Sequence, residues 1–149
     1  MAQEWPLSNP NCLGAFYPTQ AAAYAGSGFT GVRGRLLQSS TLSYRVYEAA
    51  VSFPTADAAT AFVAASVGNW KACAGSAVTV GDSVQWTFGD LTGAVPKISL
   101  LRTRQTPSNQ CQRVLSAVST IVLDVIACAP AIQDRGSQLA DQMAKNVRQ

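Results

Sequence analysis

The amino-acid sequence predicts an α+β domain built around an antiparallel sheet of about five to six strands. In a first run, from Tyr47 to Phe53, apolar side chains alternate with others such as Glu48 and Ser52. This period of two is typical of a sheet with one buried face. After Pro54, apolar residues recur every three or four positions, which indicates a long helix. Near the C-terminus, two apolar runs separated by two residues predict a hairpin.

The N-terminal part carries fewer patterns. Residues 1–10 hold two prolines and no period, so we expect a tether there. Residues 18–24 predict a short helix with Pro18 in its first turn, and the glycines at 26 and 28 end it. Strands are predicted over residues 30–39 and 42–53.

The helix after the second strand is the clearest element. Thr55 is the expected N-cap, and Asp57 lies in the first turn, where a negative charge is favourable. One stripe is predicted to face the core, formed by Ala59, Phe62, Val63, Ser66, Trp70 and Cys73.

The second half predicts further strands and a final helix. Four strands are expected, at residues 77–88 (with a hinge at Gly81-Asp82), 94–104, 111–118 and 121–128. The C-terminal helix should span about 132–147, with an inner stripe of Ile132, Leu139, Met143 and Val147.

Length and composition indicate one domain, over residues 11–149. The chain has 149 residues, of which 48% are hydrophobic, enough for a single core. Charged residues make up only 13%, about half the usual share, which fits an exported protein. Residues 1–5 lack the basic and apolar pattern of a signal peptide. We expect an extracytoplasmic, cell-envelope or cell-surface domain that meets the plasma membrane only through an anchor outside this sequence.

The combination of four cysteines with no histidine limits the chemistry. Without imidazole there is no Ser-His-Asp or Cys-His nucleophile and no His-bearing zinc site. The cysteines are too far apart for a CxxC motif, and the eight acidic residues are scattered. We therefore expect no enzyme activity, no metal and no cofactor.

The cysteines are expected to form two disulfides in an oxidising compartment. The pairing we favour is Cys73–Cys111, which ties the long helix to the hairpin, with Cys12–Cys128, which ties the N-terminal segment to the last strand. An alternative is open, because a two-residue turn at Ser119-Thr120 places Cys111 opposite Cys128.

The hairpin register that this turn sets predicts a structural ion pair. Asp124 lies in a strongly apolar run, where an unpaired carboxylate is unfavourable. With positions 111–118 paired against 128–121, Leu115 is opposite Asp124 and Arg113 is its diagonal neighbour on the same face. We predict an Arg113–Asp124 ion pair, with the more apolar face of the hairpin packed against the helices.

Positive charge is concentrated in the predicted strands. Side chains two apart on a strand share a face and lie roughly 7 Å apart. Arginines at 33 and 35, and at 102 and 104, therefore form two same-face pairs. Such pairs suit a carboxylate, phosphate or sulfate. Strand aromatics suit stacking on a sugar or an apolar ligand. The candidate ligand-binding residues are Arg33, Arg35, Tyr47, Trp86, Arg102 and Arg104. The alternatives are a solvated face and ordinary core packing.

Several segments resemble the PknH-like extracellular sensor domains of mycobacterial receptor Ser/Thr kinases and exported lipoproteins. They are NCLG at 11–14, YAGSG at 24–28, VSFP at 51–54, WKACAG at 70–75, CQRVL at 111–115 and IVLDVIAC at 121–128. The resemblance covers nearly the whole chain. It implies an antiparallel sheet surrounded by helices, two disulfides, an open cleft, and sensing of an unidentified ligand without catalysis.

The sequence is therefore consistent with two functions. The first is an extracytoplasmic ligand-recognition module of a receptor kinase or lipoprotein, which binds a small or polymeric envelope molecule, anionic ligands included, in a cleft. The second is a protein-interaction or scaffold domain with no small ligand. Nucleic acid is not expected as a partner, since the net charge is only +3 and no nucleic-acid-binding motif is present.

Overall fold

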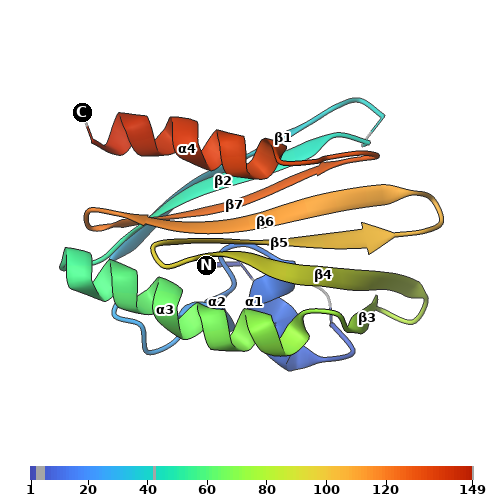
Figure 1. The fold of residues 1–149 in the computed structure, drawn as a ribbon, viewed down its shortest axis with the longest axis horizontal. Coiled ribbons are helices and arrows are strands. Elements are labelled where there is room, and N and C mark those ends of the chain that lie inside the picture. The colour runs from blue at the N-terminus through green and yellow to red at the C-terminus, as the bar shows by residue number, and fades with distance from the viewer. Residues whose placement is uncertain (3–5, 42, 149) are drawn as a thin grey trace.

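The computed structural model describes residues 1–2, 6–41 and 43–148. Its centre is a seven-stranded antiparallel sheet in the order β1-β2-β7-β6-β5-β4-β3 (Figure 1). The strands are β1 (Gly31–Gln38), β2 (Arg45–Ser52), β3 (Ala77–Val80), β4 (Val84–Ala94), β5 (Lys97–Arg104), β6 (Asn109–Val118) and β7 (Ile121–Ala129). The helices are η1 (Pro10–Cys12), α1 (Leu13–Phe16), α2 (Ala21–Tyr24), α3 (Ala56–Cys73) and α4 (Arg135–Val147).

The predicted α+β class is confirmed, and the sheet has one or two strands more than expected. The difference lies at Gly81, which adopts a φ of +60° that glycine tolerates at little cost. The hinge is therefore a full hairpin turn, with Val80 paired to Val84, and the single strand expected at 77–88 becomes β3 and the start of β4.

The long helix forms as predicted. The Thr55 hydroxyl accepts a hydrogen bond from the Ala58 backbone N–H at 3.0 Å, which confirms the N-cap. The buried positions of α3 are Ala59, Val63, Ser66, Trp70 and Cys73, all within the predicted stripe. Within the described ranges, no helix is long and apolar enough to cross a membrane.

Helices cover both faces of the sheet, as alternate residues of the β6–β7 hairpin show. Leu115 and Val122 belong to the core cluster that also includes Phe16 of α1 and Val63 of α3. Val114 and Val125 point to the other face and pack against Ala140 of α4. The Asp124 face is therefore covered by α1–α3, whereas the more apolar face packs against α4.

The C-terminal helix lies closer to the sheet than its predicted stripe implied. Its buried residues are Gly136, Ala140 and Ala144, and Leu139, Met143 and Val147 are partly buried beside them. A Cβ on Gly136 would come within 3.1 Å of the Gln112 carbonyl oxygen, so a glycine permits this approach. Ile132 is buried but precedes the helix.

The described residues of the 1–10 segment pack against the domain. Ala2 donates a backbone hydrogen bond to Thr19 and accepts one from Ala21. Leu7 is buried, and the backbone N–H of Ser8 donates to the Thr79 carbonyl. Part of the expected tether is thus bound to β3 and to the residues at 19–21.

Two disulfides are confirmed, but the favoured pairing was wrong. The bonds are Cys12–Cys73 and Cys111–Cys128, with Cα–Cα distances of 5.8 and 4.1 Å. The hairpin register places Cys111 directly opposite Cys128, as the alternative pairing required. Cys12, in the short η1 turn, then meets Cys73 at the last residue of α3.

Candidate functional site

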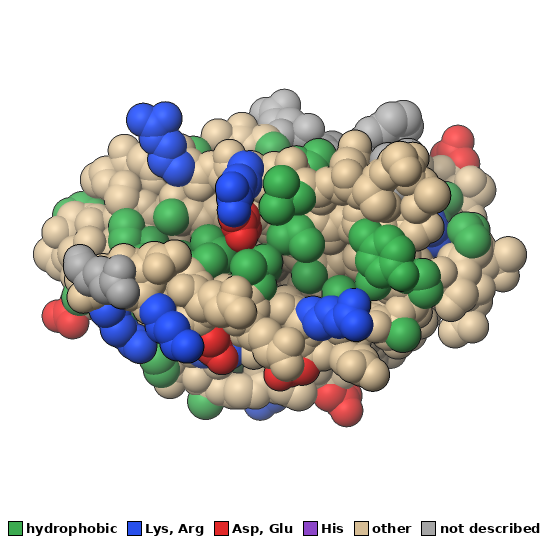
Figure 2. Space-filling model, turned by 90° about the horizontal axis from the view of Figure 1, so that it is seen from above, with side chains coloured by type: hydrophobic (Ala, Val, Ile, Leu, Met, Phe, Trp, Pro, Cys, Tyr) green, Lys and Arg blue, Asp and Glu red, His purple; other side chains and the backbone are tan. Residues whose placement is uncertain are grey.

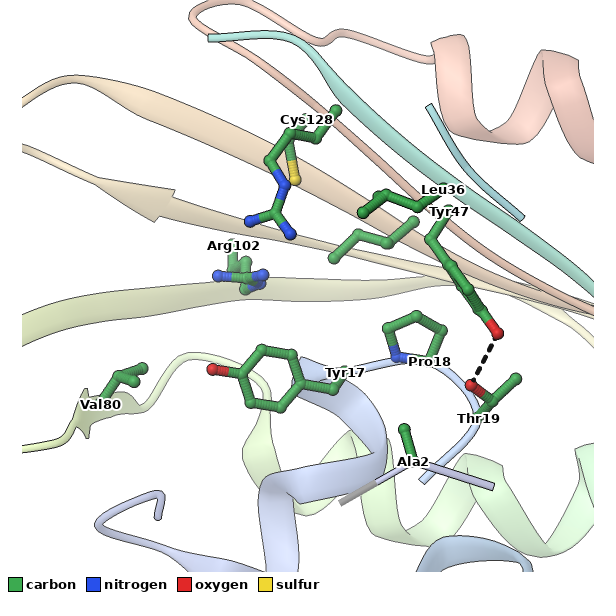
Figure 3. Close-up of a pocket in the computed structure, with 11 residues that line it drawn as sticks. Ala2, Tyr17, Pro18, Thr19, Leu36, Tyr47, Val80, Arg102 and Cys128 are labelled. Atoms are coloured by element: carbon green, nitrogen blue, oxygen red, sulfur yellow. Dashed lines mark hydrogen bonds between the residues drawn. The ribbon is translucent and has the colours of Figure 1, made fainter. Parts of the chain in front are cut away.

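A cleft of about 510 Å³ opens on the sheet face that carries α1–α3 (Figure 3). Its lining comes from Ala2, from the segment after α1 and from five strands: Ala2, Tyr17, Pro18, Thr19, Leu36, Arg45, Tyr47, Val80, Arg102, Ile126 and Cys128. A hollow of about 260 Å³ shares Arg45, Arg102 and Cys128 with it and adds Gln38, Trp86, Arg104, Asn109 and Cys111. We call the two together the sheet cleft.

The position of the sheet cleft follows from what the helices leave uncovered. At one end of the sheet, Phe53 packs against Phe62 of α3 with ring centroids 5.7 Å apart. The cleft lies at the other end, where β1, β5 and β7 finish and β2 and β6 begin. Side chains on this part of the sheet therefore face a hollow and not a helix.

Arg102 is the central cation of the cleft. Its guanidinium carbon lies 3.6 Å from the Phe16 ring centroid and 4.1 Å from that of Trp86. Arg102 is only 6% exposed, and its Nε has no hydrogen-bond partner among the described residues. Burial lowers the pKa of Arg102 to about 9, so the group is still charged at neutral pH.

Within the part of the chain that the structure describes, no carboxylate forms an ion pair with Arg102. The ion pairs there are Arg35–Glu48, Lys97–Asp141 and Arg113–Asp124. The aromatic rings offer Arg102 a cation–π contact. They do not neutralise its charge, and a buried cation without a counterion is unfavourable. An anion that enters the cleft would therefore be stabilised.

Two further arginines extend this positive region. Arg104 lies 5.1 Å from the Trp86 ring centroid, and its Nε donates to the Pro107 carbonyl at 3.0 Å. Arg45, an exposed residue, lines both hollows. The cleft thus combines cationic groups with aromatic surface.

One wall of the cleft is held by the buried ion pair. The Asp124 carboxylate accepts hydrogen bonds from Arg113, from the Thr19 backbone N–H and from the Tyr24 hydroxyl. Thr19, whose φ is +51°, also donates from its hydroxyl to that of Tyr47 across the cleft (Figure 3). The predicted helix at 18–24 begins only at Ala21, because the backbone N–H of Thr19 donates to Asp124 and Thr19 has a positive φ.

The predicted Arg113–Asp124 ion pair is confirmed, at 2.6 Å between Nη1 and Oδ1. Arg113 also donates to the carbonyls of Val125 and Gly14, and its guanidinium lies over the Trp70 ring. Burial, followed by the nearby Asp124 charge, raises the pKa of Tyr24 well above its ordinary value, so this phenol stays protonated as a donor.

The six candidate ligand residues divide between two faces. Tyr47, Trp86, Arg102 and Arg104 line the sheet cleft. Arg33 and Arg35 do not belong to it, because their register partners Ala50 and Glu48 alternate with the cleft residue Tyr47 along β2. Figure 2, viewed from the side of α4 and β1, shows Lys and Arg side chains scattered on that surface rather than gathered.

Sequence reasoning missed several cleft residues, chiefly Tyr17, Thr19 and Arg45. The signal for Arg45 was present, since it is an arginine within the strand predicted at 42–53, but its position beside Cys128 depends on the pairing of β2 with β7, two strands far apart in the sequence. Tyr17 and Thr19 lie in an irregular segment that carries no period. Among the described residues, no group of acidic or cysteine side chains could hold a metal ion.

Comparisons with known proteins agree with this architecture. The sequence model of the PknH-like extracellular domain family matches residues 1–146. The Ser/Thr-protein kinases PknH of Mycobacterium bovis and Mycobacterium tuberculosis are each 38% identical to this chain over 147 residues, or 95% of it. The chain spans about a quarter of the length of these kinases, 25% and 24% respectively.

A solved structure shows the same fold. The crystal structure of the extracellular domain of PknH from Mycobacterium tuberculosis is similar with a TM-score of 0.92 and 36% identity, covering 99% of this chain and 79% of that one. The match is to the extracellular part of the kinase and not to its catalytic domain, and it places this domain outside the cytoplasm. The chain belongs to the PknH-like extracellular domain family.

Proposed function

We propose that this domain is the ligand-recognition module of a receptor kinase or of an exported lipoprotein, and that it binds an anionic envelope molecule in the sheet cleft. The observation that carries the proposal is Arg102, a buried guanidinium between Phe16 and Trp86 without a described carboxylate partner. The cleft volume of about 510 Å³ lies within the range of small-molecule sites.

The residues that line the cleft indicate which part of a ligand each region of the cleft would bind. Arg45, Arg102 and Arg104 suit a carboxylate, phosphate or sulfate group, because guanidinium groups bind these anions through paired hydrogen bonds. Tyr17 and Tyr47 line the neighbouring part of the cleft and offer flat surfaces to a sugar ring or an apolar chain. Among the described residues that line the cleft, none is poised to act as a general acid or base, so we propose binding without turnover.

Ligand binding would also change the position of the N-terminal segment. Ala2 lines the cleft, donates a backbone hydrogen bond to Thr19 in the cleft wall and accepts one from Ala21. A ligand that moves this wall changes the position of the N-terminal segment, which offers a route for a signal toward a membrane anchor.

The test is a thermal-shift screen of anionic and neutral envelope lipids and glycans, followed by titration calorimetry of the hits. Arg45→Ala and Arg104→Ala should each weaken binding of an anionic hit roughly tenfold and flatten its salt dependence, as for loss of one charge-assisted contact. Arg33→Ala, on the opposite face, is the matched control and should bind as wild type. Equal affinity of all three variants for every anionic hit would refute the proposal.

The second candidate function, protein interaction, is favoured by the sheet edge at β1. Among the described strands, β1 pairs with β2 alone, and Leu37 and Tyr44 near this edge are about half exposed. An edge of this kind is suited to pairing with another chain. Leu37→Glu should abolish binding of a protein partner and leave small-anion binding unchanged, which distinguishes the two functions.

A further inference from the structure

The Cys111–Cys128 disulfide lies in a row of side chains that crosses four strands. Arg45 on β2 is opposite Cys128 on β7, Cys128 is opposite Cys111 on β6, and Cys111 is opposite Arg102 on β5. Side chains directly opposite each other have Cβ atoms about 4.5–5.5 Å apart. Each cysteine therefore has an arginine as its outer neighbour in the row.

The two sulfurs differ in their access to solvent. Cys128 is 8% exposed and lines both hollows of the sheet cleft, whereas Cys111 is 1% exposed and lines only the smaller one. In Figure 3 the Cys128 sulfur points from β7 into the cleft. The other bridge, Cys12–Cys73, is buried at both ends, at 0% and 1%. A reagent in the cleft therefore reaches Cys128 first.

We propose that Cys111–Cys128 is a thiol–disulfide exchange site for small anionic thiols. The incoming thiolate forms a bond to the Cys128 sulfur, the bond between the two protein sulfurs breaks, and its electron pair leaves on the Cys111 sulfur. The product is a mixed disulfide at Cys128 and a thiolate at Cys111. A second thiolate can attack the sulfur of the bound thiol, which releases a small disulfide and leaves both cysteines reduced.

The flanking arginines assist both ends of this reaction. Arg45 is exposed and attracts an anionic thiolate to the Cys128 side of the bridge. Arg102 is buried beside Cys111 and has no described carboxylate partner, so it stabilises the negative charge that develops on the leaving sulfur. The β6–β7 pairing, which runs from Gln110 and Ala129 to Val118 and Ile121, holds the two strands together after the bridge opens. The reaction does not depend on the ligand proposed above.

The experiment compares three thiols on the oxidised native protein: mercaptoethanesulfonate (anionic), 2-mercaptoethanol (neutral) and cysteamine (cationic), at equal thiolate concentration. Free thiols are blocked with iodoacetamide at intervals, and peptide mass spectrometry locates each adduct. We expect the mixed disulfide at Cys128, an intact Cys12–Cys73 bond, and a rate with the anionic thiol roughly tenfold above the cationic one at low salt.

Two variants test the role of charge. Arg45→Gln should remove most of the preference for the anionic thiol, while Arg33→Gln, an exposed strand arginine on the opposite face, should keep it. Circular dichroism of the exchanged protein should retain the native spectrum. The proposal is overturned by first attack at Cys111, by equally fast reduction of Cys12–Cys73, by no adduct under native conditions, or by a rate independent of thiol charge.

Discussion

Arg113 and Asp124 form an ion pair across the β6–β7 hairpin in which neither side chain is more than 2% exposed. The second carboxylate oxygen accepts from the Thr19 backbone and the Tyr24 hydroxyl, at 2.8 Å each. The pair therefore does more than join two strands. It connects the sheet to Thr19, which lines the cleft, and to Tyr24 at the end of α2.

Removing one partner of this pair should be strongly destabilising. We expect Asp124→Ala to lower the free energy of unfolding by about 3–5 kcal/mol, because Arg113 is left as an uncompensated buried charge. The control is Asp141→Ala, which breaks the more exposed Lys97–Asp141 pair and should cost only about 0–1 kcal/mol. Urea denaturation measures both, and a similar small cost for the two variants would contradict a structural role for Asp124.

The ion pair was predictable from sequence because it depends on local geometry. A two-residue turn fixes the hairpin register, and the register fixes which side chains share a face. The burial of the pair was not predictable, because it depends on α1–α3. Arg102 shows the same limit. The sequence shows that Arg102 and Arg104 share one face of a strand. The position of Arg102 between Phe16 and Trp86, in contrast, results from the packing of an irregular N-terminal segment.

Tyr24 should make the domain sensitive to alkali. Its pKa is raised in the folded state, mainly by burial and then by Asp124, so above about pH 10 the unfolded chain loses this proton before the folded one does. The stability from Tyr24 is fully present below pH 10 and is lost as the pH rises toward the folded-state pKa.

Tyr24→Phe tests this linkage. The variant should be less stable at neutral pH by about 1–3 kcal/mol, because Asp124 loses a buried hydrogen bond. Its stability should fall less steeply between pH 10 and 11.5 than that of wild type. Tyr44→Phe removes an exposed phenol and serves as the control. Parallel alkaline slopes for wild type and Tyr24→Phe, from denaturation at each pH, would show that Tyr24 is not responsible.

The two disulfides should differ in what they contribute to stability. Cys12–Cys73 spans 61 residues and Cys111–Cys128 spans 17. In the chain-entropy model, these loops correspond to about 4 and about 3 kcal/mol respectively. We expect Cys12→Ser/Cys73→Ser to be the less stable of the two double variants in guanidinium denaturation. The reverse order would mean that Cys111–Cys128 contributes native contacts beyond loop closure.

The pairing itself could not be chosen from the sequence. Three connectivities are possible for four cysteines, and only one of the observed bonds follows from a strand register. The other bond requires that η1 lie against the end of α3, which depends on how Phe16 and its neighbours enter the core.

The close approach of β1 at Gly34 positions the Tyr47 ring in the cleft. Gly34 on β1 has no side chain where the Tyr47 ring lies, and a Cβ there would be 2.7 Å from Cζ of that ring. Gly34→Ala therefore forces the ring to move and strains its hydrogen bond with Thr19. We expect a loss of about 1–3 kcal/mol in the free energy of unfolding, as for overpacking elsewhere.

A double-mutant cycle isolates this contact. Tyr47→Ala removes the ring, so adding Gly34→Ala to that background should cost almost nothing. Gly89→Ala is the control, because a Cβ at this strand position meets only ordinary contacts at 3.7 Å or more. If the Gly34→Ala penalty persists without the Tyr47 ring, its origin is the β1 backbone, and the cleft wall is not set by this close approach.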